Sequence, residues 1–153
     1  MKHNTFKFVG LLVAVLLIGG LLWVPSQVVF AATDSGTGTL DAQGRGLAGL
    51  SGNGTVKVSG SGTLWIKDSG GDAVTQVTGA GRATKFPGGW TRYAGLKGDA
   101  AVHGSDIQVE ITGVNINLHA EGTGKFYLRG KGTFTTGATS GTWPGTRKSF
   151  DIQ

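Results

Sequence analysis

Three residue types of a catalytic triad stand within four positions, at His103-Gly-Ser105-Asp106. In a working triad the serine, histidine and aspartate converge from separate elements, so that the histidine can take the serine proton while the aspartate orients it. Residues that follow one another in a single turn cannot converge in this way, and Ser and Asp commonly satisfy backbone groups of turns. The motif therefore predicts a turn, and we expect no catalytic residues and no enzymatic activity.

Histidine and acidic residues could also ligate a metal ion. The candidate groups are Asp99 with His103 and Asp106, and His119 with Glu121, which share one face of a strand at spacing i and i+2. Two or three such ligands do not close a zinc or calcium site. Calcium-binding β-roll repeats carry an Asp in each repeat, and the repeats of this chain lack it. We expect no metal site.

Two further motifs have simpler explanations than chemistry. Gly44-Arg-Gly46-Leu-Ala-Gly49 matches the dinucleotide fingerprint GxGxxG, but no helix follows to place its N-terminus against a pyrophosphate. Asn53-Gly-Thr55 has the form of a glycosylation site, although Asn-Gly also suits a turn. We therefore expect no cofactor.

Aromatic and basic residues form the stronger candidate for a binding surface. These residues, all at positions that face outward in the pattern described below, are Lys57, Trp65, Lys67, Lys125, Tyr127 and Arg129. An exposed ring flanked by cations offers apolar area together with hydrogen-bond donors. The set predicts a surface that binds envelope polysaccharide, an acidic polymer or another surface protein.

An eight-residue repeat must position these side chains. Residues 36–67 read GTGTLDAQ, GRGLAGLS, GNGTVKVS and GSGTLWIK, and the repeat returns over residues 122–136. Even positions are glycine or apolar and odd positions are mostly polar, which is the period of a β-strand with one face buried. Glycine inside a helix costs about 0.5–1 kcal/mol relative to alanine, so the glycine content also favours an all-β chain.

The parity of the repeat restricts how the chain turns. A two-residue hairpin loop would move the inward set from even to odd positions, yet four octets pass without a switch. The chain must therefore turn through loops of odd length or bend where glycine leaves the inward face free. Parity does change at residues 68–72, 103–106 and 112–113, which predicts hairpin turns or bulges there.

Two architectures fit this pattern. The favoured one is an antiparallel meander of roughly ten strands, closed as a barrel or flattened sandwich. The alternative is a β-solenoid in which each octet supplies one face and one corner and the repeats stack in parallel. In both, residues 32–136 form the β-repeat domain, and residues 137–153, where alternation is lost, form an irregular C-terminal tail.

The N-terminus has the features of a secretion signal. Lys2 and Lys7 precede an apolar run over residues 8–24, and Pro25 and small residues up to Ala32 follow. We expect a signal peptide over residues 1–31, with cleavage after Ala31 or Ala32, and a protein that is secreted or held at the extracellular face of the envelope. The alternative is an uncleaved membrane anchor that carries an accessory subunit.

Charge and cysteine content narrow the class further. Removing Lys2 and Lys7 from fourteen Lys and Arg leaves twelve, against nine Asp and Glu, and these residues are scattered. Such a mild excess does not favour nucleic acid as a partner. The chain has no cysteine, which excludes disulfides and thiolate chemistry. The pattern is most typical of a non-enzymatic surface, matrix or partner-binding domain; a small hydrolase acting on envelope polymers is the least favoured alternative.

The run VSGSGTLWI at residues 58–66, behind a secretion signal, resembles glycine-rich β-repeat proteins of bacterial cell surfaces, including adhesin-head β-repeat domains. Together with Gly71-Asp72-Ala73, it is also similar to small uncharacterised bacterial secreted proteins with GxGxL octets. Thr63 stands where the adhesin-head type usually has an acidic residue. The resemblance implies extracellular residence and assigns no functional residue.

Overall fold

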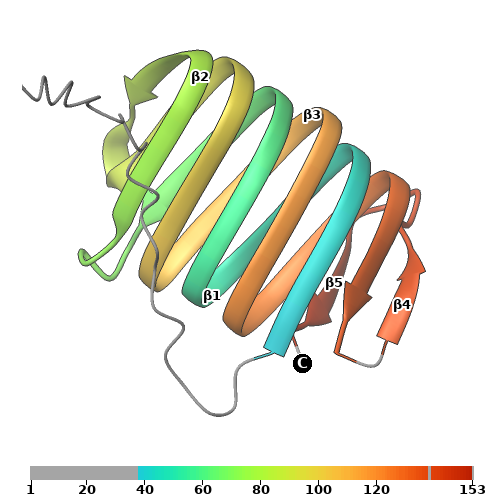
Figure 1. Ribbon diagram of the computed structural model, residues 1–153. Helices are drawn as coiled ribbons and strands as arrows, with labels where there is room; N and C mark the ends of the chain where they lie inside the picture. Colours follow the sequence, from blue (N-terminus) through green and yellow to red (C-terminus); the bar gives the residue numbers. More distant parts are fainter. Residues whose placement is uncertain (1–37, 138, 153) are drawn as a thin grey trace, which may run out of the picture.

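The computed structural model describes residues 38–137 and 139–152, and nearly all of them lie in β-strands (Figure 1). The elements are β1 (Gly38–Asp68), β2 (Val74–Lys85), the short 3-10 turn η1 (Pro87–Gly89), β3 (Trp90–Thr136), β4 (Thr139–Thr142) and β5 (Lys148–Asp151). Every strand pair is antiparallel, which confirms the all-β, antiparallel prediction. The expected signal segment lies outside the described residues, and within them no helix is long and apolar enough to cross a membrane.

The two long strands wind together into one coil. Ala120 of β3 pairs with Leu40 on one side and with Val56 on the other. Those two β1 positions are sixteen residues apart, so one turn of the coil takes two octets. Figure 1 shows the cyan and green turns of β1 alternating with the yellow and orange turns of β3, which runs back between them.

The predicted closure as a barrel is wrong, because the sheet stays open. Its strand order is β1-β3-β2, with β4 and β5 paired to β3. The chain coils, as the solenoid alternative predicts. The octets do not stack in parallel, however, because the neighbour of each β1 turn is the antiparallel strand β3. The long strands are possible because they bend at corners and do not end there.

The coil is flattened and has two outward faces. We call one the polar face: it contains residues 40–43 and 55–59 of β1, 74–78 of β2, and 99–103, 117–121 and 133–136 of β3. We call the other the aromatic face: it contains residues 47–51 and 63–67 of β1, 82–85 of β2, and 90–94, 107–112 and 125–129 of β3. The core lies between the two faces.

The inward residues of both faces form one hydrophobic core. In β1 the predicted even-numbered set is buried, namely Leu40, Ala42, Ala48, Leu50, Val56, Val58, Leu64 and Ile66. Opposite them, β3 contributes larger side chains such as Phe126, Leu128 and Ile111. Burial of each large apolar side chain contributes about 1.5–3 kcal/mol to the free energy of folding. The core therefore supplies stability in a chain that has no disulfides.

Bulges in β3 keep its apolar residues pointing inward. Gly52 pairs with Ile107 and Gly54 with Gly104, so β3 carries one extra residue between these pairs. Asp106 takes the left-handed conformation there, with φ of 47°. Asn115, with φ of 53°, does the same between Gly113 and Ile116, directly after the parity switch predicted at residues 112–113. Each extra residue changes the inward parity, as expected of a bulge. The third switch, at residues 68–72, is the loop from β1 to β2.

The segment over residues 137–153, which the sequence predicts to be an irregular tail, contains the two short strands β4 and β5. Both strands pair with β3, and Phe150 stacks on Phe126 with ring centroids 5.0 Å apart. Trp143 between them is buried, and its Nε1 donates a hydrogen bond to the carbonyl oxygen of Thr133 at 3.0 Å. These contacts cover the end of the core opposite β2.

Glycines face one another where the coil turns. Gly54, with φ of 134°, pairs with Gly122, with φ of 150°, and a Cβ on Gly54 would collide with the carbonyl oxygen of Glu121. The same facing arrangement occurs at the glycine pairs 44 and 132, 46 and 130, 52 and 124, 62 and 113, and 79 and 98. The corners therefore require two backbones to approach more closely than any side chain permits.

We expect Gly54→Ala to lower the free energy of unfolding by about 2–4 kcal/mol, because it adds both the collision and a strained φ of roughly 1–3 kcal/mol. Gly145→Ala is the matched control: no atom lies within 4 Å of the added methyl group, and its φ is not in the left-handed range. Urea unfolding of both variants measures the difference. Equal loss of stability in the two variants would contradict the proposed role of the corners.

Candidate functional site

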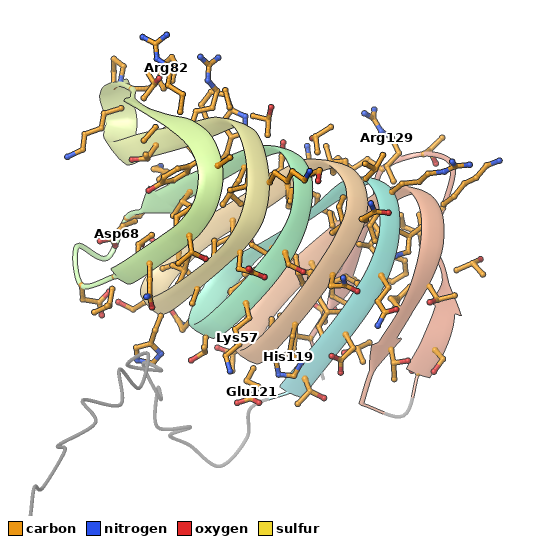
Figure 2. All side chains as sticks on the ribbon, turned by 45° about the horizontal axis from the view of Figure 1, so that its top comes forward. Lys57, Asp68, Arg82, His119, Glu121 and Arg129 are labelled. Carbon is orange, nitrogen blue, oxygen red and sulfur yellow. The ribbon has the colours of Figure 1, made fainter. Side chains whose placement is uncertain are left out.

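The structure divides the six predicted binding residues between the two faces. Trp65, Lys67, Lys125, Tyr127 and Arg129 lie on the aromatic face. Lys57 lies on the polar face, where it pairs with His119 and Ala101. Figure 2 shows Lys57 near His119 and Glu121, on the side of the coil away from Arg82 and Arg129. The six side chains therefore do not form one surface, because consecutive octets lie on opposite faces.

Trp65 is the centre of a three-ring cluster. Its ring centroid lies 5.2 Å from that of Phe86 and 6.1 Å from that of Trp90, the latter in an edge-on arrangement. Phe86 precedes η1 and Trp90 follows it, so the turn folds back over the outward side of β1. Tilted and edge-on ring pairs at these separations are favourable, and they hold the turn against the sheet.

Two cations pack against these rings. The Arg92 guanidinium lies 5.6 Å from the Trp65 centroid and 5.1 Å from the Phe86 centroid. Lys67 Nζ lies 5.9 Å from the centroid of a Trp90 ring. The buried Nε of Arg92 has no hydrogen-bond partner among the described residues. Cation–π contacts of this kind hold both cations in place without occupying their N–H donors.

A hollow of about 450 Å³ lies beside the rings. It is lined by Trp65, Phe86, Pro87, Trp90 and Glu110. Three aromatic walls with one carboxylate at the edge match the usual composition of a ligand site, which is mostly apolar with a few polar groups. We call this hollow and its two cations the tryptophan hollow.

The sequence pattern did not indicate Phe86, Trp90 or Arg92. They lie in or beside the segment around Pro87 where alternation is lost, so no parity assigned them to a face. Their composition was the one available signal, since these three aromatic or basic residues stand within seven positions. Trp65 itself was indicated correctly as an aromatic residue at an outward position.

Tyr127 forms a second group on the same face. Its ring covers Gly49, where any side chain would overlap it, and its hydroxyl donates a hydrogen bond to Glu110 Oε2 at 2.8 Å. Arg147 lies 3.8 Å from the ring centroid, and its Nη2 is 3.8 Å from Glu110 Oε2. Burial raises the pKa of the Tyr127 phenol, and so does Glu110, so Tyr127 remains a neutral donor.

Glu110 joins the two groups. It is the cross-strand neighbour of Trp65 on one side and of Gly49 on the other, and it lines the tryptophan hollow. Trp65 and Tyr127 are three strands apart, or about 14 Å at the usual strand spacing. Lys125 makes an exposed ion pair with Asp151 at 2.6 Å, and Arg129 lies near a corner of the same face. The aromatic face thus carries two groups of rings and cations, which Glu110 links.

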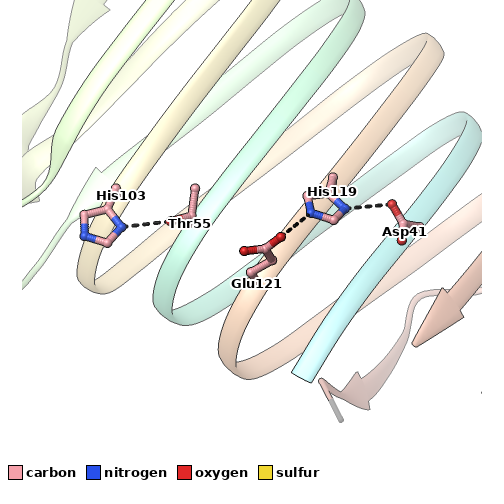
Figure 3. Close-up of polar contacts among 5 residues, drawn as sticks. All are labelled: Asp41, Thr55, His103, His119 and Glu121. Atoms are coloured by element: carbon pink, nitrogen blue, oxygen red, sulfur yellow. Dashed lines mark hydrogen bonds and ion pairs between the residues drawn. The ribbon is translucent and has the colours of Figure 1, made fainter. Parts of the chain in front are cut away.

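The predicted metal candidates are arranged differently on the polar face. His119 Nδ1 lies 2.7 Å from Asp41 Oδ1 and its Nε2 lies 3.1 Å from Glu121 Oε1 (Figure 3). Two carboxylates on opposite sides of one imidazole do not share an ion. Within the described residues no group of three or more His, Asp or Glu side chains is placed to hold a metal.

The His103-Gly-Ser105-Asp106 turn is a structural bulge. Asp72 accepts hydrogen bonds from the Ser105 backbone and hydroxyl, both at 2.9 Å, and Asn53 Oδ1 accepts one from the Asp106 backbone at 2.7 Å. His103 Nδ1 instead contacts Thr55 Oγ1 at 2.9 Å (Figure 3). Asp99 lies four residues before His103 on a strand, about 13 Å away. Neither a triad nor a metal site forms there.

Comparison with protein-family models, curated proteins and solved structures finds no match to the chain. Its function is therefore inferred from the chemistry of its two faces.

The pair of carboxylates around His119 predicts a pH-dependent stability. Partial burial lowers the pKa of His119, but the hydrogen bonds and negative charges of Asp41 and Glu121 outweigh burial and raise it above 6.5. Only the imidazolium can donate to both carboxylates at once. The stabilisation is therefore complete below the pKa of the unfolded chain and is lost as pH rises through the folded-state pKa.

We expect the free energy of unfolding of the native protein to fall as pH rises above 6.5, the ordinary histidine value, and to fall less in His119→Gln. Asp41→Asn, which removes one of the two acceptors, should give an intermediate slope. Urea titrations at each pH measure the three slopes. A native slope no steeper than that of His119→Gln would refute the linkage.

Proposed function

We propose that the protein is a secreted, non-enzymatic β-domain that binds an acidic envelope polysaccharide on its aromatic face. The tryptophan hollow carries this proposal. Its rings present apolar area to the faces of sugar units, while the ammonium group of Lys67 and the guanidinium group of Arg92 stand beside it as charged donors for carboxylate or sulfate groups.

The charge of the aromatic face favours an acidic ligand. Lys67, Arg92, Lys125 and Arg129 lie on it, against Glu110 and, in β5, Asp151, which pairs with Lys125. Glu110 is partly neutralised by Arg147 at 3.8 Å. A positive surface of this kind raises the local concentration of an anionic polymer. Added salt screens the charges and therefore weakens the binding.

The row from Trp65 to Tyr127 also supports a polymer over a small molecule. It extends for about 14 Å and runs across the strands, so a linear chain could contact the tryptophan hollow and the Tyr127–Arg147 pair together. The tryptophan hollow is open to solvent, as a site that holds part of a longer chain must be. Residence outside the cell, as predicted from the N-terminal segment, would bring the face to envelope polymers.

Trp65→Ala should reduce affinity for polygalacturonate, used as a linear acidic probe, about tenfold or more, because it removes the central ring of the hollow. Lys67→Gln, which leaves the rings in place, should reduce it less and should flatten its salt dependence. Lys57→Ala on the opposite face is the control and should bind as the native protein does.

Calorimetric titration at two salt concentrations, with thermal unfolding to check that each variant is folded, measures these effects. Salt-independent binding, or equal affinity for the native protein and folded Trp65→Ala, would exclude the aromatic face as the site. Absence of binding to any of a panel of acidic polysaccharides would exclude the proposed ligand class.

A further inference from the structure

The polar face contains a hollow that none of the assignments above uses. Its volume is about 520 Å³. It extends across five adjacent strand segments, two of β1, two of β3 and one of β2. The lining side chains that face outward are Asp41, Gln43, Lys57, Ser59, Gln76, Thr78, Asp99, Ala101, Asn117 and His119. We call it the polar hollow.

The side chains of the polar hollow form two ordered rows across the strands. In the first row the cross-strand neighbours follow one another as Gln43, Asn117, Ser59, Asp99 and Thr78. In the second row they follow as Asp41, His119, Lys57, Ala101 and Gln76. Each row makes four inter-strand steps of about 4.8 Å, so the polar groups repeat regularly over about 19 Å. Ser59, the middle residue of the first row, and Ala101, the fourth of the second row, have small side chains.

Most of the hydrogen-bonding capacity of these rows is unused within the protein. Asp41 and His119 bond to each other, and Thr78 Oγ1 reaches the Asp99 carbonyl oxygen at 3.5 Å. The amides of Gln43, Gln76 and Asn117 make no hydrogen bond to another described residue. Each amide offers both donors and an acceptor to the hollow.

The charges of the polar hollow do not select an ion. Two carboxylates, Asp41 and Asp99, face one ammonium group, Lys57, and the imidazole of His119. Each row contains one carboxylate, and the basic groups His119 and Lys57 lie between Asp41 and Asp99, so neither an anion nor a cation meets a field of one sign. The aromatic face differs in this respect, because no Phe, Tyr or Trp among the described residues lines the polar hollow.

The geometry points to a second ligand site in the polar hollow, which takes an uncharged, hydroxyl-rich chain such as a neutral oligosaccharide. Hydroxyl groups both donate and accept, as do the amide and hydroxyl side chains that line the rows. A chain lying along the first row meets an amide, hydroxyl or carboxylate group at every step, and a length of about 19 Å accommodates several sugar rings. The site does not depend on acidic-polymer binding at the aromatic face.

Two sites on opposite sides of one core would make the protein a bridge between two polymers. The polar hollow and the tryptophan hollow belong to different faces and share no lining residue. A bridge between an acidic and a neutral chain could gain avidity from both attachments, provided that both bind at once.

The test is titration of the ¹⁵N-labelled protein with cellohexaose, maltohexaose, laminarihexaose and the N-acetylglucosamine hexamer as neutral probes. We expect at least one probe to shift the backbone amides of residues 57–59, 99–101 and 117–119. The double variant Gln43→Ala with Asn117→Ala should weaken that binding about tenfold, while Trp65→Ala should leave it unchanged.

Ser59→Trp provides a second variant, because it fills the middle of the hollow from an outward-facing, half-buried strand position and should abolish the shifts. Thermal unfolding confirms that each variant is folded. If none of the four probes shifts the polar face, or if the shifts lie on the aromatic face and vanish in Trp65→Ala, the inference is overturned. A protein that binds polygalacturonate but none of the neutral hexamers would retain the proposed function and lose this site.

Discussion

The close approach of facing glycines at the corners is the constraint on which the rest of the structure depends. Gly54 and Gly122 leave no room for a Cβ between their backbones, and the same holds at the other facing pairs. A β-sheet normally twists without folding back so sharply. Paired glycines let two adjacent strands bend at the same place, so the sheet wraps around its own core and needs no hairpin within the long strands.

A turn of two octets makes the two faces chemically independent. The first and third octets, GTGTLDAQ and GNGTVKVS, contribute to the polar face, while the second and fourth, GRGLAGLS and GSGTLWIK, contribute to the aromatic face. Alternate octets are therefore neighbours in space, separated by one strand of β3. Outward residues can change on one face without affecting the other, because the core and the corners are the same for both.

The inward set of β1 could be predicted because it depends on a period of two that any buried sheet imposes. The path of β3 could not, since an even-numbered apolar set suits parallel and antiparallel neighbours equally. The sequence places Lys57 and Trp65 in one predicted surface for a related reason. The octets resemble one another, and this similarity does not show that only alternate octets share a face. Phe86 and Arg92 lie where alternation fails, and the four-residue strands β4 and β5 are too short to show a pattern. Only the contacts in the structure place Phe86, Arg92 and the two short strands.

The double pairing of β3 tests the coil most directly. In the NMR spectrum of the native protein, backbone nuclear Overhauser effects from Ala120 should reach both Leu40 and Val56, which lie on either side of it sixteen residues apart in β1. Contacts to both positions would establish the two-octet turn and the return of β3 between turns of β1. Contact to one position only, with the other neighbour of Ala120 outside β1, would contradict the coil and the separation of the two faces.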